Sequence, residues 1–398
     1  MLSSIGFHTL SLYKKLTNKE AGLLYMAFKD HNDAYIIPDK NNKSVPKNNN
    51  DPFFFSFSNY YYVIYNDKNK GLSWKLRTSV SSPYFRSKSE NEHKPCSIQV
   101  KINPKIFTGI TDYTATSAWE CLKDVETRFN LEANKISPVL GDFGSYLLNR
   151  IDYCVNFHLK ELCRSCTPEQ VITLFKRGNI PERYEERKEY DYHTSHRNKT
   201  DKNTFYLQSK SVTVNCYWKY YQLQKEFLDC PDIDNSLDVI RFEIQCKYLK
   251  VYSMSKNLKE SMDCDNPELI SSMLSDDVSN SIVTKYYNKI IRKGDYYPLE
   301  TAKRIVRDNR FQSQKEERLI NALNLINRCR GISKAKAELR GEEFEDFKRS
   351  MRELEALGIN PVTIPREWGI RHIPNLLDTY NTMFLYEKLS EIKERWGL

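Results

Sequence analysis

Apolar and polar residues alternate along several stretches of this chain, most clearly at residues 239–247. The apolar positions in this stretch are Ile240, Phe242, Ile244 and Cys246, and the polar positions are Arg241, Glu243, Gln245 and Lys247. Successive side chains of a strand point to opposite faces, so the pattern predicts a strand with one buried and one polar face. Residues 212–220 repeat this alternation and carry Tyr217 and Lys219 on the polar side.

The same alternation predicts further strands at residues 7–16, 53–65, 72–79, 96–103 and 146–159. Apolar residues three and four apart predict helices between them, at 17–30, 116–133 and 167–177. Two of these helices begin with a threonine followed three residues later by Glu or Gln, which favours a helix start. The order of elements predicts an α+β fold, in which an antiparallel sheet has helices on one face. We expect the other face to be polar and open.

The pattern becomes entirely helical near residue 265. We therefore expect three parts: an N-terminal strand–helix segment and loop (1–70), the sheet domain (71–250) and an all-α C-terminal domain (265–398). Within the last part, helices at 333–339 and 341–357 are joined by a short turn that contains glycine. This pattern is consistent either with a helix–turn–helix that reads duplex DNA or with a surface for protein contacts.

Composition narrows the class of partner and the compartment. The chain has 61 basic and 52 acidic residues, and the net charge of +9 favours a polyanionic partner. No apolar run approaches the ~20 residues of a membrane span, and the N-terminus lacks a signal-peptide pattern. The ten cysteines are scattered, as is typical of reduced thiols. We expect a cytoplasmic protein without a membrane partner.

The expected polar face carries residues suited to phosphodiester chemistry. Asp152 and Glu243 on neighbouring strands are suited to holding Mg²⁺ or Mn²⁺, which polarises a phosphodiester. Tyr217 would be the nucleophile, and Lys219 would lower its pKa or bind phosphate. Basic residues of the same sheet would contact a nucleic-acid backbone: Arg150, Arg241, Lys101, Arg77 and Lys247. The alternative is a solvated face on which the two acids pair with neighbouring arginines.

Three short motifs connect these residues to a known family. They are Arg150-Ile151-Asp152, Tyr217-Trp218-Lys219 and Ile240-Arg241-Phe242-Glu243. Over residues 95–250 the chain resembles the rolling-circle replication initiators and the related relaxases of plasmids, conjugative elements and phages. The resemblance implies a nicking-type domain that cuts one strand at an origin and forms a 5′-phosphotyrosine, with a divalent metal held by acidic residues. It also implies origin or transfer-site DNA, single-stranded or supercoiled, and a host helicase as partners.

Several alternatives accompany this interpretation. The protein would be an initiator of plasmid or phage replication, a relaxase for conjugative transfer, or an inactive nucleic-acid-binding relative. Trp218 and Gln222 stand where the family motif has other residues, and the family's paired-histidine metal motif is absent. Other residues of interest are the rival nucleophiles Tyr220 and Tyr221, the expected metal-site neighbour His158, and Glu226 as a third ligand. The single Cys163-x-x-Cys166 motif has no second pair, which argues against structural zinc.

Overall fold

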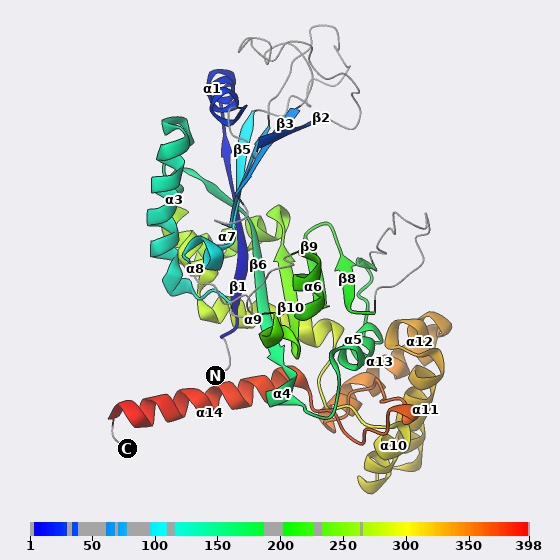
Figure 1. Ribbon diagram of the computed structural model, residues 1–398. Helices are drawn as coiled ribbons and strands as arrows, with labels where there is room; N and C mark the ends of the chain where they lie inside the picture. Colours follow the sequence, from blue (N-terminus) through cyan, green and yellow to red (C-terminus); the bar gives the residue numbers. More distant parts are fainter. Residues whose placement is uncertain are drawn as a thin grey trace, which may run out of the picture.

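One antiparallel sheet organises the molecule (Figure 1). The computed structural model describes residues 4–29, 34–38, 61–67, 71–77, 96–109, 116–186, 202–226, 233–262 and 266–396. Within these ranges the strands follow the order β2-β3-β4-β5-β1-β6-β10-β9-β8-β7. Their bounds are β1 Gly6–Lys15, β2 Ala34–Pro38, β3 Tyr61–Asp67, β4 Leu72–Arg77, β5 Ser97–Ile102, β6 Leu147–His158, β7 Glu185–Glu186, β8 Thr204–Gln208, β9 Val212–Trp218 and β10 Val239–Cys246. An antiparallel sheet with packed helices and a helical C-terminal region confirms the predicted fold class.

Strand β1 lies in the middle of the sheet, between β5 and β6. Leu10 pairs with Ile102 of β5 on one side and with Ile151 of β6 on the other. The N-terminal segment is therefore part of the sheet, and the division expected at residue 70 does not separate it from the strands that follow. A local pattern could not show this, because both partners of β1 lie far along the chain.

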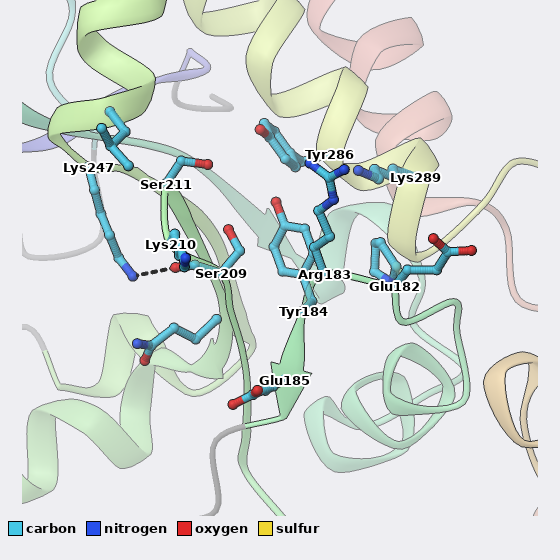
Figure 2. Close-up of a pocket in the computed structure, with 13 residues that line it drawn as sticks. Glu182, Arg183, Tyr184, Glu185, Ser209, Lys210, Ser211, Lys247, Tyr286 and Lys289 are labelled. Carbon is cyan, nitrogen blue, oxygen red and sulfur yellow. Dashed lines mark hydrogen bonds between the residues drawn. The ribbon is translucent and has the colours of Figure 1, made fainter.

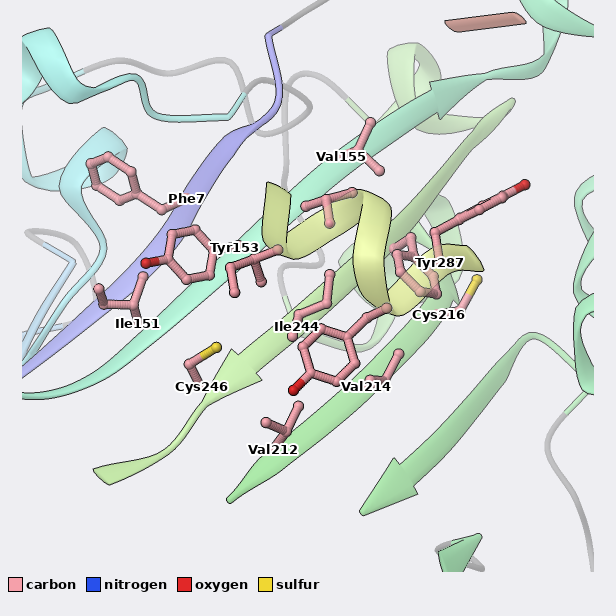
Figure 3. Close-up of a cluster of buried hydrophobic side chains, with 14 of the residues drawn as sticks. Phe7, Ile151, Tyr153, Val155, Val212, Val214, Cys216, Ile244, Cys246 and Tyr287 are labelled. Carbon is pink, nitrogen blue, oxygen red and sulfur yellow. The ribbon is translucent and has the colours of Figure 1, made fainter. Parts of the chain in front are cut away.

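The apolar face of the sheet is covered by helices (Figure 3). Tyr287 of α9 (Asp276–Ile290) packs edge-on against Phe157 and Phe242, with ring centroids 5.8 and 5.4 Å away. Tyr153 of β6 donates a hydrogen bond from its hydroxyl to the Met273 carbonyl of α8 (Asn266–Leu274), at 2.8 Å. Each large side chain buried in this way contributes about 1.5–3 kcal/mol.

A helix occupies most of the interval between the two domains that the sequence predicts, 71–250 and 265–398. Helix α7 (Tyr248–Met262) turns Val251 and Met254, three residues apart, into the core. Most of the other side chains of this helix are polar, so its buried stripe is narrow and the hydrophobic pattern does not predict a helix here. Since α7, α8 and α9 all pack with the sheet, the all-helical region beyond it begins at α10.

The remaining helices lie between the strands and in the C-terminal region. Their bounds are α1 Asn18–Lys29, α2 Pro104–Phe107, α3 Leu122–Ile136, α4 Leu159–Leu162, α5 Pro168–Lys176, α6 Lys219–Glu226, α10 Leu299–Asp308, α11 Ser313–Cys329, α12 Ile332–Glu338, α13 Gly341–Ala356 and α14 Leu376–Trp396. The predicted capping box at Thr167 and Gln170 is present. Helix α14 returns to the sheet, where Tyr380 packs on Phe157 at 6.3 Å. None of the described helices is long and apolar enough to cross a membrane.

Candidate functional site

The polar face of the central strands is closed rather than open. Antiparallel pairing sets Asp152 opposite Gln245, and Arg241 opposite both Asn156 and Tyr217. The exposed fractions of Asp152, Arg241 and the neighbouring Glu243 are only 1%, 0% and 4%. The expectation of an open, solvated face is therefore wrong, although Asp152 does pair with the neighbouring Arg150, as the alternative interpretation expects. Alternation predicts which residues share a face but not what covers that face.

The Tyr217 hydroxyl contacts one acidic and one basic side chain. Its hydroxyl donates to Glu243 Oε2 at 3.3 Å and also hydrogen-bonds with Arg241. The Arg241 guanidinium in turn donates from Nε to Asn156 Oδ1 at 2.8 Å. Burial, and then the charge of Glu243, raises the pKa of Tyr217 well above its ordinary value. The phenol is therefore neutral near pH 7 and needs a proton acceptor before it can act as a nucleophile, and Glu243 is in contact with it.

Asp152 is engaged by Arg150. Arg150 Nε and Nη2 each donate to a different oxygen of Asp152, both at 2.6 Å. Burial raises the pKa of Asp152 to about 7; the nearby charge of Glu243 adds to this shift, and Arg150 opposes it. Among the described residues, no three or more His, Cys, Asp or Glu side chains are grouped as metal ligands. The two acids predicted to hold a metal thus lie near each other, but they do not form a ready cation site.

His8 belongs to the same cluster, and the sequence analysis missed it. The pairing of β1 with β6 shifts between Phe7 and Thr9, which is a β-bulge with His8 as its extra residue. His8 Nδ1 lies 3.9 Å from Glu243 Oε2 and 3.0 Å from Thr9 Oγ1. Burial, and then the charges of Arg241 and Lys219, lowers the pKa of His8 well below its ordinary value. The imidazole is therefore neutral near pH 7. The bulge depends on pairing with a strand far along the chain, so the sequence does not show that His8 lies beside Glu243. The only signal in the sequence is that a histidine lies within the predicted strand.

Positive charge surrounds this cluster. Lys219, which is 3% exposed, lies at the start of α6, one residue after β9 ends, rather than on the strand as expected. Its Nζ donates to Gln222 Oε1 at 2.8 Å, so Gln222 positions this lysine where the family motif has an acid. Lys101 and Lys105 also act electrostatically on His8. A site with this charge is suited to an anionic group such as a phosphate.

The other predicted residues are dispersed. Arg241 is fully buried, so its expected contact with a nucleic-acid backbone does not fit its position. Arg77 lies half-buried on β4, and Lys101 is exposed on β5. His158 lies six residues beyond Asp152 on the same strand, roughly 20 Å away, so it is not the expected metal-site neighbour.

The rival tyrosines lie on α6 rather than on a strand. Tyr220 accepts a hydrogen bond from Gln224 Nε2 at 2.7 Å, and its ring lies 5.4 Å from that of Trp218. Tyr221 is half-buried on the same helix. The side chain of Glu226 lies outside the described residues. Of the three tyrosines weighed as the nucleophile, only Tyr217 stands on the strand that pairs with Glu243's own strand.

A second polar cleft, of about 1130 Å³, lies at the other end of β9 (Figure 2). Lys247 lines it and donates to the Ser209 carbonyl at 2.8 Å. Lys289 of α9 lies over the Tyr184 ring, 5.4 Å from its centroid. The charged and aromatic residues that line the cleft are Glu182, Arg183, Tyr184, Glu185, Lys210, Lys247, Tyr286 and Lys289. Tyr286 is buried and Lys289 covers the Tyr184 ring, so the exposed lysines and Arg183 define the chemistry of this cleft, which suits contact with an anionic backbone.

Comparison with known proteins adds no family. No protein-family model matches the chain, and no curated protein is similar to it in sequence. The resemblance to rolling-circle initiators therefore depends on the three short motifs, and any functional conclusion depends on the geometry around Tyr217.

Proposed function

We propose that this protein nicks and rejoins one DNA strand at a specific site through Tyr217, and thereby initiates rolling-circle replication of a plasmid or phage. The observation that supports this most is the 3.3 Å hydrogen bond from the Tyr217 hydroxyl to Glu243, within a buried, mainly basic cluster. This contact gives a buried phenol the proton acceptor that it needs in order to act as a nucleophile.

The proposed reaction begins with proton transfer from Tyr217 to Glu243. The tyrosyl oxygen then attacks phosphorus, which forms a phosphotyrosine bond and breaks the bond to the 3′ oxygen. The 3′ oxygen takes up a proton and leaves as a hydroxyl, and attack by a 3′-hydroxyl on the phosphotyrosine reverses the reaction. Arg241 orients the phenol, and Lys219 stabilises the negative charge that develops on the phosphate.

The proposal also includes a divalent cation, Mg²⁺ or Mn²⁺. When bound, such an ion would polarise the phosphodiester. Both oxygens of Asp152 accept hydrogen bonds from Arg150, so the two predicted acids do not fit a cation as they are arranged. No step above depends on the ion. Full activity in EDTA would remove it from the proposal.

The DNA partner is an origin or a transfer site, single-stranded or supercoiled, with a host helicase acting afterwards. Arg183, Lys210 and Lys247 line the second cleft, at the opposite end of β9 from Tyr217, and supply positive charge for contact with the DNA backbone. A relaxase for conjugative transfer would use the same chemistry on a different DNA site. A binding protein without nicking activity is the non-enzyme alternative, and the raised pKa of Tyr217 favours it.

The test is to incubate the protein with a supercoiled plasmid that carries the protein's own gene region, in the presence of Mn²⁺. The proposal predicts relaxed circles with protein covalently attached to a 5′ end. DNA that is shifted in a gel but uncut would indicate the binding protein instead. The plasmid backbone without the insert is the control for site specificity.

A further inference from the structure

A pair of cysteines lies close together in the turn between α4 and α5. The turn reads Cys163-Arg164-Ser165-Cys166. The Cys166 thiol donates to Cys163 Sγ, with the two sulfur atoms 3.2 Å apart. Ser165 Oγ lies 3.3 Å from the same Cys163 sulfur. Cys163 is 6% exposed and Cys166 is partly exposed. The sulfurs need to move only about 1 Å to reach the ~2.05 Å of a disulfide.

The surroundings make the two thiols unequal. The hydrogen bond from Cys166, which outweighs the opposing effect of burial, lowers the pKa of Cys163 to about 6, and Ser165 adds to the shift. Cys166 shifts in the opposite direction, since its hydrogen bond to Cys163 and burial raise its pKa. Cys163 is thus suited to attack a disulfide, and Cys166 is suited to displace the mixed disulfide that forms on Cys163.

A metal does not account for this pair. Among the described residues, no third His, Cys, Asp or Glu joins the two cysteines in a metal-binding group. His372 also acts electrostatically on Cys163, but its Nε2 is already 2.8 Å from Asp295 Oδ2. A structural zinc site needs four ligands, so two thiols alone indicate different chemistry.

We propose that Cys163 and Cys166 form a reversible redox site, which small disulfides oxidise to an intramolecular disulfide. The Cys163 thiolate attacks one sulfur of the small disulfide; a new sulfur–sulfur bond forms, and one small thiolate leaves. Cys166 then loses its proton and attacks Cys163 Sγ, which releases the second small thiolate. The protein loses two hydrogens, and the small disulfide becomes two thiols. This inference does not depend on the proposed nicking activity.

The experiment uses the position of Arg164 between the two cysteines. The reduced full-length protein is incubated with oxidised glutathione, blocked with N-ethylmaleimide and digested with trypsin without reductant. Cleavage after Lys160, Arg164 and Lys176 gives peptides 161–164 and 165–176. We expect these peptides to stay joined, with a mass two hydrogens below their sum, and to separate after treatment with dithiothreitol. Separate peptides after oxidation would overturn the proposal.

Two variants and two internal controls sharpen the test. Cys166→Ser should stop at a glutathione adduct on Cys163, whereas Cys163→Ser should leave Cys166 largely unmodified. Cys121 and Cys329 are also partly exposed, but burial raises the pKa of both, so they should react at least tenfold more slowly than Cys163. Equal rates at Cys163 and Cys329 would contradict the proposal. The unfolding midpoint of each variant confirms that it is folded.

Discussion

The two faces of the central strands both bury side chains but differ in chemistry. On one face, apolar side chains of β6, β10 and β9 pack under α9, which is the arrangement that stabilises a sheet. On the other face, Asp152, Arg241 and Glu243 are no more than 4% exposed. Burying charge costs free energy unless every charge is paired, and a paired network still stabilises less than apolar packing does. The polar face therefore stabilises the fold less than the apolar face does.

The largest effects on stability should come from substitutions of Phe242 and Arg241, which are adjacent in the chain but lie on opposite faces of the sheet. Phe242→Ala removes packing against Tyr287 and should lower the free energy of unfolding by about 3–5 kcal/mol. Arg241→Ala should cost about 3–5 kcal/mol for a different reason, because it leaves buried Glu243 without its cation. Urea denaturation measures both changes.

A double-mutant cycle separates the two causes. Adding Glu243→Gln should recover part of the loss in Arg241→Ala, since the uncompensated charge is removed, and should recover nothing in Phe242→Ala. Additive losses in both backgrounds would mean that Arg241 acts through packing alone. The two faces would then not differ as described.

Glu243→Gln should slow nicking by about 10²–10⁴-fold, because the amide still contacts Tyr217 but is a poor proton acceptor. The initial rate of plasmid relaxation measures this effect. Gln245→Ala is the matched control, since Gln245 Nε2 contacts the other oxygen of Glu243 at 3.0 Å. A loss as large in Gln245→Ala would indicate that the position of Glu243 matters more than its charge.

The buried acid should also give the polar face a characteristic dependence on pH. The pKa of Asp152 is raised to about 7 when the protein is folded, so the folded state holds a proton that the unfolded state releases near pH 4. This contribution to stability is present below about pH 4 and is lost as the pH rises to 7. Asp152→Asn should therefore gain stability relative to the natural chain over this range. A relative loss would show that Arg150 outweighs burial and lowers the pKa.

The sequence predicts the faces of β6, β9 and β10 because alternation is a local property of strands. It also places Tyr217, Asp152 and Glu243 on the same face, as the register confirms. It fails where distant segments meet. The central position of β1 and the bulge at His8 both depend on pairing between strands far apart in the chain.

The expectation of an open face fails for a related reason. Alternation shows which polar residues share a face, whereas their burial depends on the tertiary structure that surrounds the strand. Lys219 illustrates the point, since it lies on a helix beyond the strand and is still almost fully buried beside the cluster.

The smallest effect should come from the second cleft, at the far end of β9. Exposed Lys210 and Lys289 line it, and the double variant Lys210→Glu/Lys289→Glu should weaken binding of a single-stranded oligonucleotide. The slope of log affinity against log salt should fall by about 0.7 for each lysine that contacts a phosphate. Fluorescence anisotropy at several salt concentrations measures this slope. Lys123→Glu, at an exposed position on α3, is the control and should leave the slope much less changed.

The central claim is that Tyr217 is the nucleophile. Tyr217→Phe removes only the hydroxyl, so it should abolish the covalent protein–DNA adduct while DNA binding stays within about tenfold. Tyr220→Phe, on α6, is the matched control and should form the adduct normally. The measurement is the amount of protein that stays on the 5′ end of the cut plasmid after denaturation in detergent. We expect an adduct in Tyr220→Phe and none in Tyr217→Phe; an adduct that persists in Tyr217→Phe would show that another residue is the nucleophile.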